Sequence, residues 1–243
     1  MQPIHNVDLS LLKNFVNKTP SFESDYEIVD ETDDFIVILK KHGLAVQVTD
    51  KEVDDLESIL NNRYKEKVHV LNRIDQPVTG LVIFGKNKNF ASNFTEMLKE
   101  RSVKKTYLAL VSGNPEKEPT ELKHYIKKLH NRAMTADEKV DEYFKEAVLV
   151  YTLLQSFDKY HLLKIDLKTG RFHQIRAQLA TMEMPIKGDL KYGSRRPNLD
   201  RSIGLLSYKL EFIHPFTLEK HCYKAPLPNN DILWSLVDMS LID

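Results

Sequence analysis

The chain has 243 residues, enough for one large domain or two small ones, and enough to bury a core without disulfides. Its 35 basic and 35 acidic residues cancel, so a site for a polyanion must be a local patch. The single cysteine, Cys222, excludes an internal disulfide and is expected to be a small buried residue in a reducing compartment. The sequence has neither the long apolar run of a membrane helix nor the pattern of a signal peptide, so we expect a cytoplasmic protein.

Apolar spacing predicts alternating helices and strands along the chain, starting with a helix over residues 9–16. Strands are predicted over 26–29, 35–39, 68–71, 81–84, 104–111, 148–157, 161–167, 205–212 and 221–224. Further helices are predicted over 53–60, 90–101 and 231–239, and from Phe172 toward Pro185. Many neighbouring strands are joined by connections too short for a crossover helix. The pattern therefore favours an α+β fold with a mixed or antiparallel sheet.

Residues 70–86 hold charged side chains between two predicted strands. Pro77 blocks a ladder hydrogen bond, so the chain turns there, and Thr79-Gly80 allows the backbone to approach another group closely or to adopt a tight geometry. Arg73 and Asp75 are thereby held on a constrained loop, as catalytic groups often are. On this stretch alone the better interpretation is a turn-forming Asp75 with Arg73 as its surface partner.

A second charged segment, TGRFHQIR over residues 169–176, places a glycine turn before a predicted helix. The first turns of that helix carry Arg171, His173 and Arg176, and the latter two share a face. Backbone donors at a helix start, together with two arginines, suit phosphate binding. A solvated basic helix face explains the same residues at least as well.

Basic residues also gather in three runs near tyrosines. Tyr107 lies on a predicted strand just after Lys104 and Lys105, and by itself it is interpreted as a core aromatic residue. Basic runs beside aromatics are compatible with RNA binding, and scattered surface lysines are the alternative. The runs are Lys99, Arg101, Lys104 and Lys105; Lys123, Lys127, Lys128 and Arg132; and Lys187, Lys191, Arg195, Arg196 and Arg201.

Metal and nucleotide sites are not predicted. The nine histidines form neither a metal-binding pair four residues apart beside a glutamate nor a cluster with cysteine. The sequence also lacks a glycine-rich loop ending in Lys-Ser or Lys-Thr, so nucleotide hydrolysis is not expected.

Four segments, in order, resemble the RluA-type family of RNA pseudouridine synthases. Residues 73–87, RIDQPVTGLVIFGKN, are similar to the family signature H-R-L-D-x-x-T-S-G-L-L-x-F-A-K. Residues 105–113, KTYLALVSG, resemble the strand K-x-Y-x-A-x-V-x-G. Residues 169–193 resemble T-G-R-x-H-Q-I-R-x-H-L-x-x-x-G-x-P-I-x-G-D-x-x-Y-G, and residues 205–215 a late L-H-A-x-x-L-x-F-x-H-P segment.

The resemblance implies a pseudouridine-synthase-like fold, with a mixed, largely antiparallel sheet flanked by helices and an active-site cleft across it. We expect a catalytic domain over 26–243 and a helical extension over 1–25, too short for the small RNA-binding domain of many relatives. The implied enzyme is a monomer that acts on structured RNA and needs no cofactor. A compact stem-loop of transfer RNA (tRNA) or a hairpin of large-subunit ribosomal RNA (rRNA) is the hypothesised target.

The resemblance also implies roles for individual residues. Asp75 would be the catalytic carboxylate, attacking the ribose or the base or stabilising a cationic sugar. Arg176 would keep it ionised within salt-bridge distance, in a bidentate pose that lysine cannot adopt. Tyr107 would stack on the base and assist proton removal, and Arg73 would enter the RNA in place of the flipped nucleotide. Lys105, Arg171 and His173 would contact the RNA.

The sequence departs from the family pattern at several positions, which we interpret as changes in packing around the loop. Asn72 and Gln178 replace histidines, Val78-Thr79 replaces Thr-Ser, Ser207-Tyr208 replaces His-Ala, and Leu39-Lys40-Lys41 replaces Asn-Lys-Pro. Two other functions are the alternatives. A glycoside hydrolase would in most families need a second acid. A catalytically inactive RNA-binding module would have no reason to retain Asp75, Tyr107 and Arg176 together.

Overall fold

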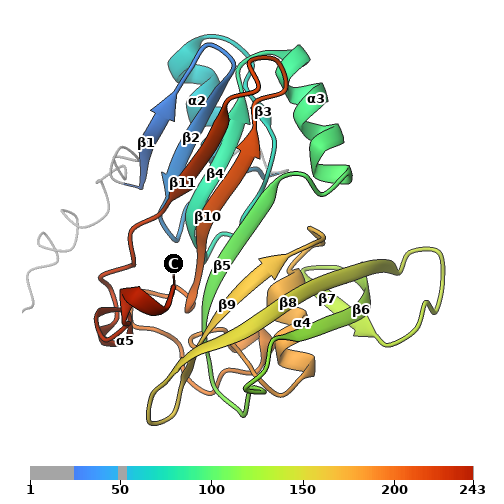
Figure 1. Ribbon diagram of the computed structural model, residues 1–243, viewed down its shortest axis with the longest axis vertical. Helices are drawn as coiled ribbons and strands as arrows, with labels where there is room; N and C mark the ends of the chain where they lie inside the picture. The colour runs from blue at the N-terminus through green and yellow to red at the C-terminus, as the bar shows by residue number, and fades with distance from the viewer. Residues whose placement is uncertain (1–24, 49–53, 243) are drawn as a thin grey trace, which may run out of the picture.

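The computed structural model describes residues 25–48 and 54–242, and its strands form one continuous sheet (Figure 1). The strands are β1 (Tyr26–Glu31), β2 (Phe35–Lys40), β3 (His69–Val70), β4 (Thr79–Gly85), β5 (Lys104–Val111), β6 (Thr120–Leu129), β7 (Arg132–Ala136), β8 (Lys145–Ser156), β9 (His161–Leu167), β10 (Leu205–Ile213) and β11 (Lys220–Lys224). The helices are α2 (Leu56–Tyr64), α3 (Lys88–Lys99), α4 (Gln174–Thr181) and α5 (Ile232–Ser235), with short 3-10 turns η2 (Leu190–Tyr192) and η3 (Met239–Leu241).

The strand order is β1-β2-β4-β10-β5-β9-β8-β6-β7, with β3 paired to β4 and β11 to β10. Among the described strands, β4 and β10 form the one parallel pair, and the other pairs are antiparallel. The predicted α+β fold with a mixed, largely antiparallel sheet is confirmed. In Figure 1, β10 and β5 lie at the centre of the sheet. Strands β1–β4, with helices α2 and α3, lie at one end of the sheet, and strands β6–β8, with helix α4, lie at the other.

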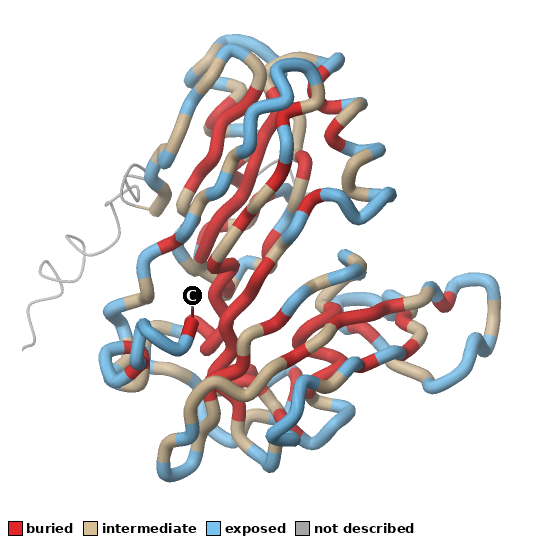
Figure 2. The backbone as a smooth tube through the Cα atoms, viewed as in Figure 1, coloured by how far each residue is buried: buried red, intermediate tan, exposed pale blue. Residues whose placement is uncertain are grey.

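Strand β2 shows why its sequence, FIVILK, is apolar without alternation: both of its faces are buried. Ile36 lies in one core cluster with residues of α2, and Phe35 lies in another with Phe90 and Phe94 of α3. Figure 2 shows the same pattern, with burial concentrated along the central strands. The sheet is therefore a middle layer, rigid enough to position the loops at the ends of its strands.

The predicted close approach at Gly80 is confirmed. Gly80 has a φ of +135°, and a Cβ there would lie 2.4 Å from the carbonyl oxygen of Ser207. The two residues pair where β4 runs parallel to β10. The Ser207 hydroxyl donates to the Leu81 carbonyl at 3.1 Å, so this departure from the family pattern is satisfied inside the sheet. The residue after the Asp75 loop must consequently be glycine.

The β6–β7 hairpin was not among the predicted elements. Its sequence is rich in lysine, which masks a period-two pattern in which Leu122, His124 and Ile126 are buried. That alternation was the signal that could have identified the strand. The hairpin matters because its far end reaches the site described below.

Other expectations need correction. The closing helix predicted over 231–239 is only α5 with the turn η3, and α4 begins at Gln174, after Arg171 and His173. Cys222 is exposed, because it lies on the face of β11 opposite the half-buried His221 and Tyr223. The helix predicted over 9–16 lies outside the described residues. Within the described part of the chain, helices are too short or too polar to cross a membrane.

Candidate active site

Asp75 lies on a tight loop between β3 and β4. The Val78 amide donates to the Asp75 carbonyl at 3.0 Å, which closes a four-residue turn with Gln76 and Pro77 at its centre. The neighbouring Gln76 is tied to Gly43 twice, accepting from its amide at 2.9 Å and donating to its carbonyl at 2.8 Å. The loop is thus fixed by a bond within the turn and by two bonds to Gly43, and the Asp75 side chain is only 24% exposed.

Lys40, at the end of β2, binds the backbone of this loop and of the segment after β2. Its Nζ donates to the carbonyls of Lys41 and Leu44 at 2.8 Å and of Gln76 at 3.3 Å. Burial lowers the pKa of Lys40 to about 7, and the charge of Asp75 opposes that shift. Three carbonyl acceptors match the three protons of an ammonium group. Lys40 is not among the predicted site residues, although a lysine at the end of an apolar strand was a usable signal.

Arg176, on α4, contacts two carboxylates. Its Nη1 donates to Asp75 Oδ2 at 2.9 Å, which confirms the predicted ion pair. The expected bidentate pose is wrong, because the fork faces Asp189 instead: Nε lies 2.7 Å from Oδ2 and Nη2 lies 2.8 Å from Oδ1. Burial disfavours the charge, but the bonds and charges of Asp189 and Asp75 raise the pKa of Arg176 above its usual range. Asp189 is not among the site residues predicted from the sequence.

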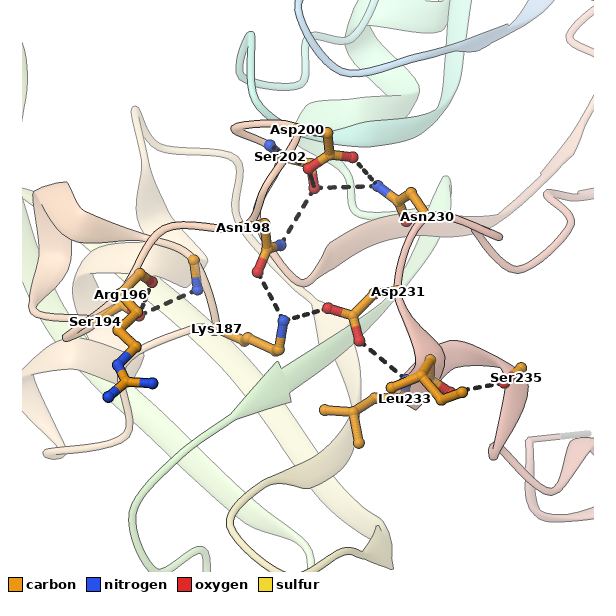
Figure 3. A network of polar contacts seen from close by, with 12 residues as sticks. Lys187, Ser194, Arg196, Asn198, Asp200, Ser202, Asn230, Asp231, Leu233 and Ser235 are labelled. Atoms are coloured by element: carbon orange, nitrogen blue, oxygen red, sulfur yellow. Dashed lines mark hydrogen bonds and ion pairs between the residues drawn. The ribbon is translucent and has the colours of Figure 1, made fainter.

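The segment around Asp189 is fixed by a polar network (Figure 3). Gly188 has a φ of +83°, and a Cβ there would lie 2.8 Å from the Ser202 carbonyl oxygen, so the position requires glycine. The Gly188 amide donates to the Ser194 hydroxyl at 3.1 Å. Lys187 donates to Asn198 at 2.7 Å and pairs with Asp231. This network holds the backbone that presents Asp189 to Arg176.

Tyr107 lies on β5 with its side chain buried, paired in register with Ser207 of β10. Burial raises the pKa of Tyr107 to about 12, while a hydrogen bond to Ser207 lowers it in part. The phenol is therefore neutral near neutral pH. Tyr107 lines the same cleft as Asp75 and Arg176, so the structure brings together the three residues predicted to be catalytic.

That cleft has a volume of about 1880 Å³, well above the roughly 300–1,000 Å³ of ordinary small-ligand pockets. A space of this size suits a polymer. Of the predicted basic runs, only part faces the cleft, and Arg195, Arg196 and Arg201 do not line it. The basic residues that do line it, beyond Arg176 and those predicted as RNA contacts, are Lys67, His69, Lys88, Lys99, Arg101, Lys128, His130, Lys168 and Lys191.

The residues predicted to contact RNA all line the cleft but differ in exposure. Arg73 and Arg171 are exposed, and Arg171 Nε donates to the Glu146 carbonyl at 2.8 Å. Lys105 is half-buried, and burial lowers its pKa. The His173 side chain is only 8% exposed, and its Nε2 lies 3.7 Å from Asp75 Oδ2. Their RNA-binding roles stay predictions.

Two departures from the family pattern make local bonds. Asn72 Oδ1 accepts from the Ile83 amide at 2.7 Å, which extends the pairing of the loop with β4. Gln178, fully buried on α4, donates to the carbonyls of Leu122 and Ala147 at 3.1 and 3.2 Å. Its Oε1 is buried without a hydrogen-bond partner. Gln178 therefore packs inside the scaffold, whereas Asn72, which also lines the cleft, ties the Asp75 loop to β4.

Comparison with known proteins agrees with this architecture. Residues 34–181 match the family described as RNA pseudouridylate synthase. The chain belongs to this family. It is an RNA pseudouridine synthase of the RluA type, an isomerase. The match spans the Asp75 loop, Tyr107 and Arg176, so the site described above lies inside the shared region.

Individual relatives show how far the similarity extends. The tRNA pseudouridine synthase C of Vibrio parahaemolyticus is 28% identical over 227 residues, covering 84% of this chain and 91% of that one. The ribosomal large subunit pseudouridine synthase D of Borreliella burgdorferi is 30% identical over 197 residues, covering 76% and 60%. Human RNA Pseudouridylate Synthase Domain Containing 1 shares the fold, with a TM-score of 0.70 at 23% identity over 88% of this chain and 90% of that one.

Proposed function

We propose that this protein converts a specific uridine of a structured RNA into pseudouridine, with Asp75 as the catalytic carboxylate. In this isomerisation the bond from ribose C1′ to uracil N1 breaks, the base turns, and C1′ bonds to C5. C5 loses a proton and N1 gains one, so atoms balance without an oxidant or a phosphate donor. The observation that carries the proposal is the ion pair between Asp75 and Arg176, 2.9 Å long, inside a polymer-sized cleft.

The two carboxylate oxygens of Asp75 have different surroundings. Oδ2 accepts from Arg176, whereas Oδ1 has no hydrogen bond to any described residue. The charge-assisted bond to the guanidinium holds Oδ2 in place. Oδ1 is then the oxygen available to attack the substrate or to stabilise positive charge on the sugar.

The other residues have supporting roles. The buried ring of Tyr107 offers a stacking surface for the uracil, and its neutral phenol makes stacking a better-supported role than proton removal. Arg73, exposed at the cleft, is placed to occupy the space of the flipped nucleotide. Flipping costs a few kcal/mol, which phosphate contacts from Lys105 and Arg171 would offset.

The target is a stem-loop of tRNA or a hairpin of large-subunit rRNA. The names of the relatives support both, since one is a tRNA enzyme and another acts on the ribosomal large subunit. Pseudouridine mapping of total RNA, with and without this protein, tests the proposal. We expect one missing site in a short structured loop, which the purified protein then modifies in the isolated hairpin. A site modified only in an assembled ribosomal subunit would refute the compact-target proposal.

A glycoside hydrolase is the alternative enzyme class for a site with one available carboxylate. Asp189, the second acid near the site, is fully engaged by Arg176 and only 1% exposed, so it is not free to act as the second acid. Nucleoside analysis of the reacted RNA separates the two chemistries. Pseudouridine supports isomerisation, whereas free uracil with an abasic site would support hydrolysis.

A further inference from the structure

His173 lies between the proposed catalytic carboxylate and a tyrosine from a different segment. Its Nε2 is 3.7 Å from Asp75 Oδ2, and its Nδ1 is 2.8 Å from the Tyr192 hydroxyl. The Tyr192 hydroxyl in turn accepts from the Ala133 amide of β7 at 2.6 Å. A line of polar contacts therefore runs from the β6–β7 hairpin to the oxygen that also binds Arg176.

The assignment of donors and acceptors among Ala133, Tyr192 and His173 determines which ring nitrogen of His173 carries the proton. The Tyr192 oxygen already accepts the Ala133 N–H, so the hydroxyl proton is free to donate to the other contact, His173 Nδ1. A ring nitrogen that accepts carries no proton in the neutral imidazole, so Nε2 carries it. The Nε2–H then faces Asp75 Oδ2.

The imidazole is also held mechanically. Phe172 stacks on it with ring centroids 3.8 Å apart and planes at 19°, and Lys128 lies 4.8 Å from the Phe172 ring. His173 has a φ of 51°, in the left-handed region that is uncommon for residues other than glycine but in which histidine is enriched. A side chain stacked on Phe172, hydrogen-bonded through Nδ1 and only 8% exposed has a defined orientation toward Asp75.

We propose that His173 supplies a neutral Nε2–H donor to Asp75 Oδ2, and that Tyr192 is a positioning residue that fixes this tautomer. The inference rests on the proposed role of Asp75. The present separation is longer than a hydrogen bond, and a small approach closes it, as catalytic contacts tighten toward the transition state. With Arg176 and His173 both on Oδ2, Oδ1 becomes the single reacting oxygen. This role goes beyond the RNA contact expected from the sequence.

The tautomer can be measured without any activity. Nitrogen NMR of protein labelled at histidine distinguishes Nε2–H from Nδ1–H, and comparison with His173→Gln assigns the His173 signals. We expect Nε2–H in the wild type and a mixture of tautomers in Tyr192→Phe. Tyr151→Phe is the matched control, because that buried hydroxyl accepts from the Glu116 amide outside the cleft, and it should leave the His173 signals unchanged. An Nδ1–H tautomer in the wild type would overturn the proposal.

Two substitutions separate donation from backbone strain. The Gln side-chain nitrogen reaches the position of imidazole Nε2, whereas Asn is too short but tolerates the left-handed backbone better. On RNA tritiated at uracil C5, isolated from cells lacking the protein, His173→Gln should keep single-turnover tritium release within about threefold of the wild type. His173→Asn should lose on the order of tenfold or more, at unchanged RNA affinity. Asn equal to or better than Gln would show a purely structural role.

Failure of this inference is distinct from failure of the proposed function. If the wild type releases no tritium from any RNA, the proposed function fails, while the NMR measurement still decides the tautomer. If the wild type is active and Tyr192→Phe keeps both the tautomer and the rate, the positioning role of Tyr192 is overturned. If the tautomer becomes mixed and the rate falls at constant RNA affinity, the inference is supported.

Discussion

Arg176 gives the two-nitrogen edge of its guanidinium to Asp189 and a single nitrogen to Asp75. The contacts to Asp189 are 2.7 and 2.8 Å, and the contact to Asp75 is 2.9 Å. Bidentate pairing fixes the plane of a guanidinium, so Asp189 orients Arg176 and Arg176 orients Asp75. One oxygen of Asp75 stays unbound by described residues, as its proposed chemistry requires.

The first prediction is that Arg176→Lys is nearly inactive although it retains the charge. One ammonium cannot reproduce three directed bonds to two carboxylates, so we expect single-turnover tritium release to fall by about 100-fold or more. Arg63→Lys, at an exposed position on α2, is the matched control and should keep full activity. Activity of Arg176→Lys close to that of the control would contradict the bridging role.

The second prediction concerns Asp189, which the structure adds to the site. Asp189→Asn leaves the buried Arg176 with weaker compensation and replaces an acceptor by a donor facing Nε or Nη2. Removing one charge of a buried pair costs roughly 3–5 kcal/mol. Denaturant unfolding should show this loss, and the RNA-dependent activity of the folded fraction should fall as well. A variant with wild-type stability would mean that Asp75 alone holds Arg176.

The third prediction uses the low pKa of His173. Burial lowers it to about 4 from 6.5; Asp75 and Asp189 oppose the shift, while Arg176 and Lys191 add to it. Between these values the unfolded chain binds a proton and the folded protein does not, so His173 lowers stability as pH falls from about 6.5 toward 4. His173→Gln should therefore lose less stability than the wild type between neutral pH and about pH 5. Parallel urea-unfolding curves at both pH values would refute the shift.

The fourth prediction concerns RNA affinity. With no net charge on the chain, binding should depend on cationic residues of the cleft and weaken steeply with salt. Lys105→Gln should reduce the slope of log affinity against log salt by about 1. Lys220→Gln, at an exposed site on β11 outside the cleft, should leave that slope unchanged. Equal effects of the two substitutions would indicate binding over the whole surface.

Much of the sheet could be predicted because its central strands are apolar on both faces, as β2 is. Pro77 and Gly80 also mark the end of the loop between β3 and β4. The β6–β7 hairpin was missed because its outward residues are charged and mask the alternation of its buried ones. Closely spaced motifs reveal local structure, whereas a polar strand is recognised mainly through the partners it pairs with.

The site divides in the same way. The Asp75–Arg176 pair was predicted through motifs, although the two residues are far apart in the chain. Asp189 and Tyr192 were missed because their contribution depends on bonds to Arg176 and His173, which only the folded backbone around Gly188 brings into reach. Both residues match fixed positions of the family block over residues 169–193, which was the available signal, but such a match does not say which side chains they contact.

Substitution of Asp75 by asparagine tests the central claim most directly. Asparagine has the same shape and still accepts from Arg176, but its amide cannot act as the carboxylate. The account predicts that Asp75→Asn has an RNA affinity within about twofold of the wild type and the same free energy of unfolding. It also predicts that this variant releases no tritium above background from C5-labelled RNA. Substantial turnover by a homogeneous Asp75→Asn preparation would contradict the assignment of Asp75 as the catalytic carboxylate.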